Sequence, residues 1–156
     1  MTKNGKKAVR FLLHHTKDLL PVVTGSLVFC ADQLMKGSVE LKQNGELWGN
    51  ETVELKKAHN DGFVLGAARD HPELVKTVPA VAIGAAAAAY AAKGKKTAVG
   101  NAGEGLLLGG AASNLYDRYR RGYVVDYVHV KKTPLQKIIF NIGDAAIALG
   151  ALLSNF

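Results

Sequence analysis

The chain has 156 residues, 48% of them hydrophobic and 21% charged, and its formal net charge is +7. This length suits one domain over residues 1–156, and the single cysteine, Cys30, excludes both an internal disulfide and a cysteine-based zinc cluster. The positive charge predicts an anionic partner, either nucleic acid or the surface of a lipid bilayer. Since Cys30 lies among apolar residues, we expect it to pack in the interior.

Four apolar segments follow one another along the chain, and each is close to the length that a helix needs to cross a bilayer. They cover residues 19–35, 77–92, 97–116 and 138–156. The second, "TVPAVAIGAAAAAYAA", lacks the polar stripe that a helix on the surface of a soluble protein needs. The pattern therefore favours a mainly α-helical membrane protein with four transmembrane helices over a soluble helical bundle.

The charges of the connecting segments predict the orientation of these helices. Basic residues before the first segment, and "KGKK" at 93–96, place both parts in the cytoplasm by the positive-inside rule. Residues 37–75 hold more acidic than basic side chains and then lie outside, so both termini lie inside. Residues 117–137 disagree with this rule, because they are predicted to lie outside and yet carry several basic side chains.

The segment between the first two predicted helices has a different pattern. Apolar residues alternate at Val39 and Leu41 and again at Val53 and Leu55, around "NG" and "GN" turn signals. We therefore expect a small extracytoplasmic β-hairpin or short sheet within residues 38–58.

Ionisable side chains interrupt three of the four apolar segments, at Asp32, Glu104 and Asp144. Inside a membrane, such side chains usually face a protein interior and mark a functional site. Lys36 follows Asp32 by four residues, so the two can pair on one helix face. Glu104 lies near the inner end of the third segment, where we expect it to contact water.

Asp126 and Asp144 are the predicted catalytic pair. Asp126 lies in "GYVVDYV", before the fourth segment, and Asp144 lies about one to two turns into that segment from the same side. Two carboxyl groups at close range in a low dielectric cannot both ionise cheaply, so one keeps a proton. An aspartic protease uses this arrangement: the ionised group takes a proton from water, and the protonated group polarises the scissile carbonyl. The alternative is that Asp126 is a solvated loop residue and Asp144 caps a helix.

Four motifs, in matching order over most of the chain, resemble those of the lipoprotein signal peptidases, the type II signal peptidases of bacteria. They are "DQLMK" at 32–36, "HNDGFVLG" at 59–66, "GGAASNLYDRYRRGYVVDY" at 109–127 and "FNIGDAAI" at 140–147. The resemblance implies a four-span enzyme of the bacterial cytoplasmic membrane, with both termini cytoplasmic and the active site toward the extracytoplasmic face. Such an enzyme cleaves prolipoproteins immediately before a diacylglyceryl-modified cysteine, without a metal or organic cofactor. Its expected partners are these substrates and membrane lipids and not nucleic acid, and we expect a monomer.

The resemblance also implies roles for individual residues. The family's catalytic aspartates fall on Asp126 and Asp144, and its other polar pocket positions fall on Asp32, Lys36, Asn60, Gly110, Asn114, Arg118 and Asn141. Asp117, beside Arg118, is open to a structural role. The chain departs from the family pattern at four positions, which puts the shape of the pocket and the substrate preference in question: Met35, Phe63, Ser113 and Gly143.

Two other functions stay open at this point. A protein of this family type can bind lipidated peptides without cutting them. A soluble basic helical protein can bind nucleic acid through "RYRRGY" at 118–123, because arginines with interleaved tyrosines suit phosphate contacts and base stacking.

Overall fold

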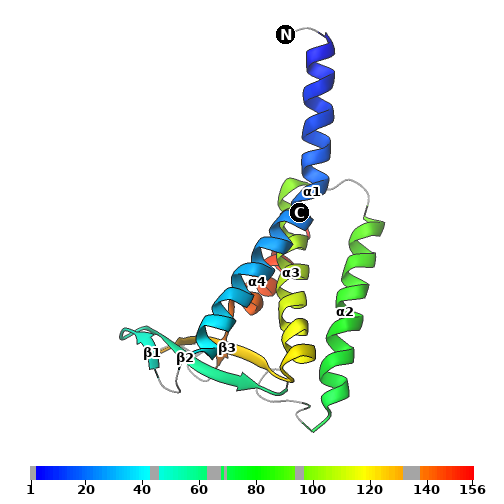
Figure 1. The fold of residues 1–156 in the computed structure, drawn as a ribbon. Helices are drawn as coiled ribbons and strands as arrows, with labels where there is room; N and C mark the ends of the chain where they lie inside the picture. Colours follow the sequence, from blue (N-terminus) through cyan, green and yellow to red (C-terminus); the bar gives the residue numbers. More distant parts are fainter. Residues whose placement is uncertain (1–2, 43–45, 63–67, 69, 94–96, 132–137) are drawn as a thin grey trace.

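The computed structural model describes residues 3–42, 46–62, 68, 70–93, 97–131 and 138–156. Figure 1 shows a mainly helical protein with a small antiparallel sheet at one end of its helices. In chain order the elements are α1 (Lys3–Glu40), β1 (Glu46–Gly49), β2 (Val53–Asn60), α2 (Pro72–Ala92), α3 (Ala98–Arg120), β3 (Val124–Val130), β4 (Ile139–Phe140) and α4 (Ile142–Leu153). Phe63, one of the four departures from the family pattern, lies outside the described residues.

The sheet contains four strands in the order β1-β2-β3-β4, and all neighbours are antiparallel. The expected hairpin exists as β1 and β2, but its predicted first strand at Val39 and Leu41 is wrong. Helix α1 continues to Glu40, where Val39 is buried against Val125 and Tyr127 of β3. Burial on a helix face therefore overrides the short alternating pattern.

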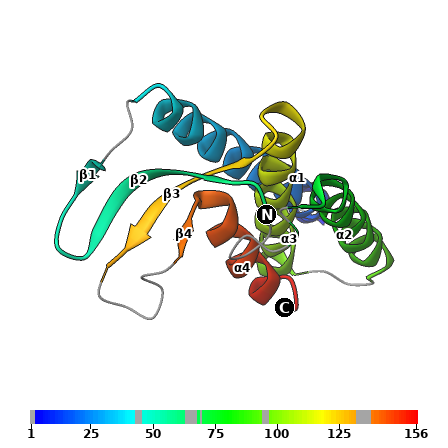
Figure 2. The same cartoon turned by 90° about the horizontal axis from the view of Figure 1, so that it is seen from below.

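We expected strands only in the connection between α1 and α2, and the sheet in fact also includes strands from a second connection. Strands β3 and β4 come from the connection between α3 and α4. Seen from below, β4 lies beside β3 and leads directly into α4 (Figure 2). The sheet thus ties the end of α3 to the start of α4, which brings distant polar residues together.

Helix α3 packs between α1 and α4, and glycines permit this close packing. A Cβ atom added at Gly109 would lie 2.6 Å from the Cα of Gly25 in α1. On another face of α3, a Cβ atom at Gly103 would lie 2.6 Å from the backbone nitrogen of Ser154, just after α4. Side chains near the C-terminal end of α3 can therefore reach both flanking helices.

The fourth apolar segment is shorter as a helix than the sequence predicts. Residues 139–140 form β4, and α4 begins only at Ile142, with Asn141 as its N-cap. Its 12 residues span about 18 Å, which is less than the roughly 30 Å hydrocarbon core of a bilayer. Two other segments in the described part of the chain are long and apolar enough to cross a membrane, Leu19–Glu40 and Pro72–Ala92.

The distribution of polar and apolar residues is the reverse of that in a water-soluble protein. Large apolar side chains on the helices point outward, as at Leu27 and Val81, each 65% exposed. Among the described residues, the buried set holds only a few apolar side chains beside a larger group of polar or charged ones, including Asp32, Lys36 and Asn141 at 0%. An apolar outside around a polar interior is the arrangement of helices that face lipid.

Candidate active site

Asp126 lies in β3 and is 4% exposed, so it is not a solvated loop residue. Its carboxylate accepts hydrogen bonds from the Nδ2 of Asn141, at 2.7 Å, and from the Nδ2 of Asn60 at the end of β2, at 3.2 Å. The pairing of β2 with β3, which sets Ala58 opposite Asp126, brings Asn60 within reach. Two amide groups from different elements therefore hold this carboxylate in place.

Asp144 lies in the first turn of α4, and its two carboxylate oxygens serve different purposes. Oδ2 accepts the backbone N–H of Asn141 at 3.1 Å, and the side chain of Asn141 accepts the N–H of Asp144 at 2.8 Å, which completes a capping box. Oδ1 accepts from the Nδ2 of Asn114 in α3 at 2.7 Å. Asp144 is thus a helix cap with a second oxygen turned toward the polar interior, so the two interpretations of this residue are compatible.

Asn141 joins the two aspartates, since its amide nitrogen contacts Asp126 and its amide oxygen contacts the backbone of Asp144. Burial is the main cause that raises the pKa of Asp126 to about 6, and the negative charge of Asp144 acts in the same direction. The amides of Asn60 and Asn141 oppose this rise, because they donate to the ionised form. Asp126 therefore keeps its proton to a higher pH than an ordinary aspartate does.

The predicted pair of Asp32 and Lys36 forms the fully buried base of the site, with Lys36 Nζ 2.6 Å from Asp32 Oδ2. The same ammonium lies 3.1 Å from Asp117 Oδ2 and donates to Asn114 Oδ1 at 2.7 Å. Since an ammonium group only donates, it fixes the oxygen of the Asn114 amide toward Lys36. The nitrogen of that amide must then face Asp144.

Arg118 and Gly110 complete the set of predicted site residues. Arg118 is 7% exposed and donates to the carbonyl oxygen of Gly62 at 2.7 Å, which fixes the chain just after Asn60. Gly110 supplies space and no polar side chain, because a Cβ atom there would overlap the carbonyl group of Gly143 in α4. All nine predicted site residues thus lie in or beside one group of polar side chains between α1, α3, α4 and the sheet. We call this group the polar cluster.

Sequence reasoning missed the contribution of Tyr127 to this cluster. Its hydroxyl donates to Asp32 Oδ1 at 2.9 Å and accepts the backbone N–H of Ile142 at 3.1 Å. It therefore links α1 to the first residue of α4. The only signal in the sequence is an aromatic residue with a polar tip next to Asp126, and that signal does not name its partners.

Asp117 and Ser113 are two further members that the sequence left open or unassigned. Asp117 is fully buried, pairs with Arg121 and accepts the backbone N–H of Val125 at 3.2 Å, so it fastens the end of α3 to the strand that carries Asp126. Ser113, also fully buried, donates to Asp32 Oδ2 at 2.6 Å.

Two expectations about single residues are wrong. Glu104 is 4% exposed within α3, because that helix continues on both sides of it and packs between two others, so it does not lie at a wet helix end. Cys30 is exposed and does not pack in the interior, because it lines an open groove between α1 and α3. In the described parts of the chain, no group of three or more His, Cys, Asp or Glu side chains is arranged to hold a metal ion.

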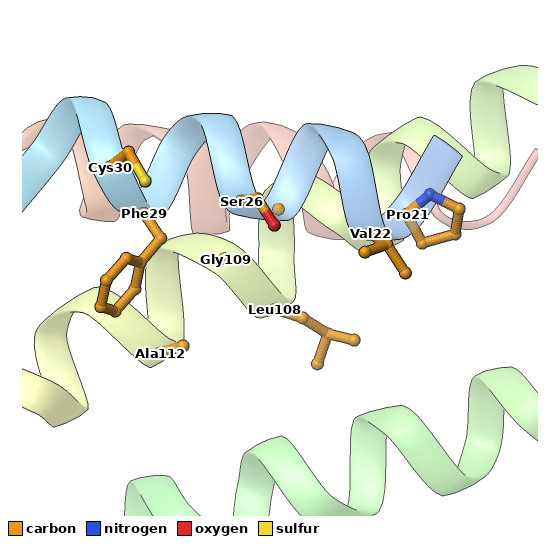
Figure 3. Close-up of a pocket in the computed structure, with 9 residues that line it drawn as sticks. Pro21, Val22, Ser26, Phe29, Cys30, Leu108, Gly109 and Ala112 are labelled. Carbon is orange, nitrogen blue, oxygen red and sulfur yellow. The ribbon is translucent and has the colours of Figure 1, made fainter. Parts of the chain in front are cut away.

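An apolar groove of about 420 Å³ lies between α1 and α3, away from the polar cluster. Figure 3 shows Val22 and Phe29 of α1 and Leu108 and Ala112 of α3 along it, with Cys30 nearby. Its lining contains no carboxyl, amide or basic side chain. This groove therefore offers no side chain suited to proton transfer.

Comparisons with known proteins identify the family of the chain. The family model described as "Signal peptidase (SPase) II" matches residues 25–156. A lipoprotein signal peptidase of Rhizorhabdus wittichii is 32% identical over 140 residues, which cover 82% of this chain and 78% of the relative. Another, of Sphingopyxis alaskensis, is 31% identical over 144 residues, covering 85% of this chain and 80% of the relative.

Solved structures share the fold. One bacterial membrane enzyme aligns with a TM-score of 0.78 at 20% identity, covering 85% of this chain and 83% of its own. A second aligns with a TM-score of 0.76, also at 20% identity, covering 85% of this chain and 88% of its own. The family match over most of the chain, and relatives above 30% identity along most of their length, establish that the chain belongs to the signal peptidase II family of proteases.

Proposed function

We propose that Asp126 and Asp144 are the catalytic pair with which this signal peptidase cleaves prolipoproteins immediately before a diacylglyceryl-modified cysteine. Removal of signal peptides from prolipoproteins is the activity that the family assigns to the chain. The observation that carries the proposal is the position of Asn141, which donates to Asp126 and accepts from Asp144. The buried carboxyl group of Asp126 and the first turn of α4, which carries the partly buried Asp144, are thereby held by one asparagine.

The chemistry follows from sharing one proton between these groups. The ionised carboxylate takes a proton from a water molecule, whose oxygen attacks the scissile carbonyl carbon. The protonated carboxyl donates to the carbonyl oxygen, and the departing amine receives a proton as the C–N bond breaks. A pKa of about 6 at Asp126 suits the protonated partner, while amide donors from Asn60, Asn114 and Asn141 restrict how the two carboxyl groups turn.

The membrane arrangement that supports this function has four embedded helices, both termini in the cytoplasm and the sheet on the extracytoplasmic face. The C-terminal end of α1, the end of α3 and the start of α4 all lie beside the sheet (Figure 1). We propose that the bilayer of the bacterial cytoplasmic membrane surrounds the exposed apolar side chains of α1 and α2, and that the protein acts as a monomer. A lipidated substrate would then reach the pair from the surrounding lipid.

The structure offers little support for nucleic-acid binding through residues 118–123. Arg118 turns inward to the carbonyl oxygen of Gly62, and Arg121 pairs with the buried Asp117 and donates to Gln33 at 3.1 Å. Two of the three arginines are therefore engaged within the protein and do not form a continuous basic surface.

Cleavage of a purified diacylglyceryl-modified prolipoprotein by the detergent-solubilised enzyme tests the proposal. We expect Asp126→Asn and Asp144→Asn each to lower the rate by about 10²- to 10⁴-fold while the protein still inserts and folds. Asp70→Asn is the matched control, because Asp70 is exposed, and it should cleave at the wild-type rate. Full activity in either of the first two variants contradicts the catalytic assignment. Binding of the precursor without any product from the wild-type protein would instead favour a peptide-binding function.

A further inference from the structure

The Asp32 carboxylate is the point where four elements meet. Oδ1 accepts from the hydroxyl of Tyr127 in β3, which in turn accepts the backbone N–H of Ile142 in α4. Oδ2 accepts from Ser113 in α3 and lies 2.6 Å from Lys36 Nζ. The position of this carboxylate, which is 0% exposed, therefore depends on every wall of the polar cluster.

The hydrogen bonds around Ser113 leave its hydroxyl proton one destination. Gln33 Nε2 donates to Ser113 Oγ at 2.9 Å, and Lys36 Nζ lies 3.4 Å from the same oxygen. Both neighbours only donate there, since Arg121 donates to Gln33 Oε1 and thereby fixes the amide orientation. The one proton of the Ser113 hydroxyl is thus directed at Asp32 Oδ2, 2.6 Å away.

Gly143 adjoins the same carboxylate oxygen from the opposite helix. A Cβ atom at this position would lie 3.0 Å from Asp32 Oδ2, and equally 3.0 Å from Asn141 Oδ1 and from the carbonyl oxygen of Gly110. A carboxylate at the end of a side chain can move away from a new methyl group at little cost if nothing holds it. Ser113 and Lys36 do hold this one, so the space beside Gly143 and the hydroxyl of Ser113 act on the same atom.

Asp32 is linked to the proposed catalytic pair through short contacts of Lys36 and Asn114. Lys36 Nζ lies between Asp32 Oδ2 and Asn114 Oδ1, at 2.6 Å and 2.7 Å. The amide nitrogen of Asn114 donates to Asp144 Oδ1 at 2.7 Å. A shift of Asp32 would draw the ammonium away from Asn114 and release the amide that faces Asp144.

We propose that Ser113 is a positioning residue of the reaction, and that it acts together with the missing side chain at Gly143 to set the Asp32 carboxylate and, through it, the orientation of Asp144. This inference rests on the proposed function of the aspartate pair. Neither residue touches the reacting atoms in this scheme. Both should therefore affect the catalytic step more than the binding of the precursor.

A double-mutant cycle of Ser113→Ala and Gly143→Ala tests the coupling, because it isolates the interaction between neighbouring positions. The readouts are kcat and KM for cleavage of a purified diacylglyceryl-modified prolipoprotein, the pH dependence of kcat, and the Tm of each solubilised protein. Alanine at 113 removes the hydroxyl without placing a glycine inside α3. We expect each single change to lower kcat by about 5- to 50-fold with KM changed less than about twofold. The double variant should be about fivefold more active than the product of the two single effects, because Ser113→Ala removes one of the groups that hold the Asp32 carboxylate against the new methyl group.

Other outcomes decide against the inference. Independent effects of the two changes, or a loss expressed only in Tm or in KM, would assign Ser113 and Gly143 a purely structural role. If Gly143→Ala does not fold, Ser113→Ala alone remains decisive: its kcat should fall by about 5- to 50-fold while KM changes less than about twofold. An unchanged kcat there would overturn the proposal. The Asp126→Asn and Asp144→Asn variants distinguish failure of this inference from failure of the proposed function. Full activity in either variant would contradict the assignment of the catalytic pair itself.

Discussion

Two carboxyl groups on neighbouring strands of one sheet show opposite behaviour. Little of either residue is exposed to solvent, 9% of Glu54 in β2 and 4% of Asp126 in β3, but Asp126 lies deeper in the protein. Hydrogen bonds from Lys131, at 2.5 Å, and from His129, at 2.6 Å, lower the pKa of Glu54 to about 2. Burial and the neighbouring Asp144 instead raise the pKa of Asp126 to about 6.

The difference lies in which influence dominates at each carboxyl group. Hydrogen bonds from Lys131 and His129 outweigh burial at Glu54 and favour its ionised form, so Glu54 is a structural ion-pair residue. At Asp126, burial and the negative charge of Asp144 outweigh the two amide donors that favour the ionised form. Of the two carboxyl groups, Asp126 therefore keeps its proton to the higher pH.

Among changes that keep both aspartates, the largest effect is expected from giving Asp126 a cationic neighbour like that of Glu54. Asn60→Lys places an ammonium where a neutral amide now donates to Asp126. An adjacent opposite charge lowers a carboxyl pKa by about 1 to 3, so the proton on the pair is lost and cleavage at pH 7 should fall about 10- to 1,000-fold. Cleavage rates measured from pH 4 to 8 check this, and an undiminished rate at pH 7 would show that no shared proton is needed.

Removal of the shared asparagine is expected to have a smaller effect. Asn141→Ala deletes the donor to Asp126 and the side-chain cap of α4. Loss of a hydrogen bond to a charged group should lower kcat by about 10- to 100-fold, and loss of the cap should lower the free energy of unfolding by about 1 kcal/mol. Cleavage kinetics and denaturant unfolding of the same sample separate the two. A stability loss without a kinetic one would leave Asn141 as a helix cap only.

A neutral substitution of Asn60 should shift the pH dependence of the cleavage rate in the direction opposite to that of Asn60→Lys. Asn60→Leu removes the donor that lowers the pKa of Asp126, so that pKa rises further. The pair then keeps its proton to higher pH, and the alkaline decline of the cleavage rate should move upward by less than about one pH unit. A downward shift would be inconsistent with the role given to this amide.

The smallest effect on activity is expected at Glu54. Glu54→Gln should leave cleavage at pH 7 within about twofold of the wild type, since Glu54 lies outside the polar cluster. Because the pKa is lowered from 4.5 to about 2 in the folded protein, the ion pair stabilises the fold above pH 4.5 and loses this effect as the pH falls toward 2. Thermal unfolding between pH 6 and 3 should therefore depend less on pH in the variant, and an equal dependence would count against the ion pair.

Some of the polar cluster could be predicted because its spacing is local. Lys36 follows Asp32 by one helical turn, so their contact needs only that the segment be helical. Asn141 and Asp144 have the spacing of a capping box, which likewise depends on a few consecutive residues. The contact of Tyr127 with Asp32, 95 residues apart, has no such signal, because it exists only when β3 lies across the end of α1.

The boundaries of the helices and strands show the same limit of prediction from local sequence. Val39 reads as part of a short strand in the sequence, yet in the structure it is the buried end of a helix against Val125. Likewise, the fourth apolar segment gives no sign that Ile139 and Phe140 pair with β3 before α4 begins. Pairing partners far along the chain decide these boundaries, and hydropathy alone does not contain that information.

The sequence by itself determined that apolar helices surround a small set of polar residues, and which residue types that set contains, since the cost of a charge in an apolar segment is a local property. Only the tertiary structure decided which carboxyl groups lie beside cations and which lie beside amides. That choice depends on the close passage of α3 between α1 and α4 and on the register of β2 with β3. It also decides where a proton can be held, because the pKa of a buried group follows its neighbours in space and not its neighbours in sequence.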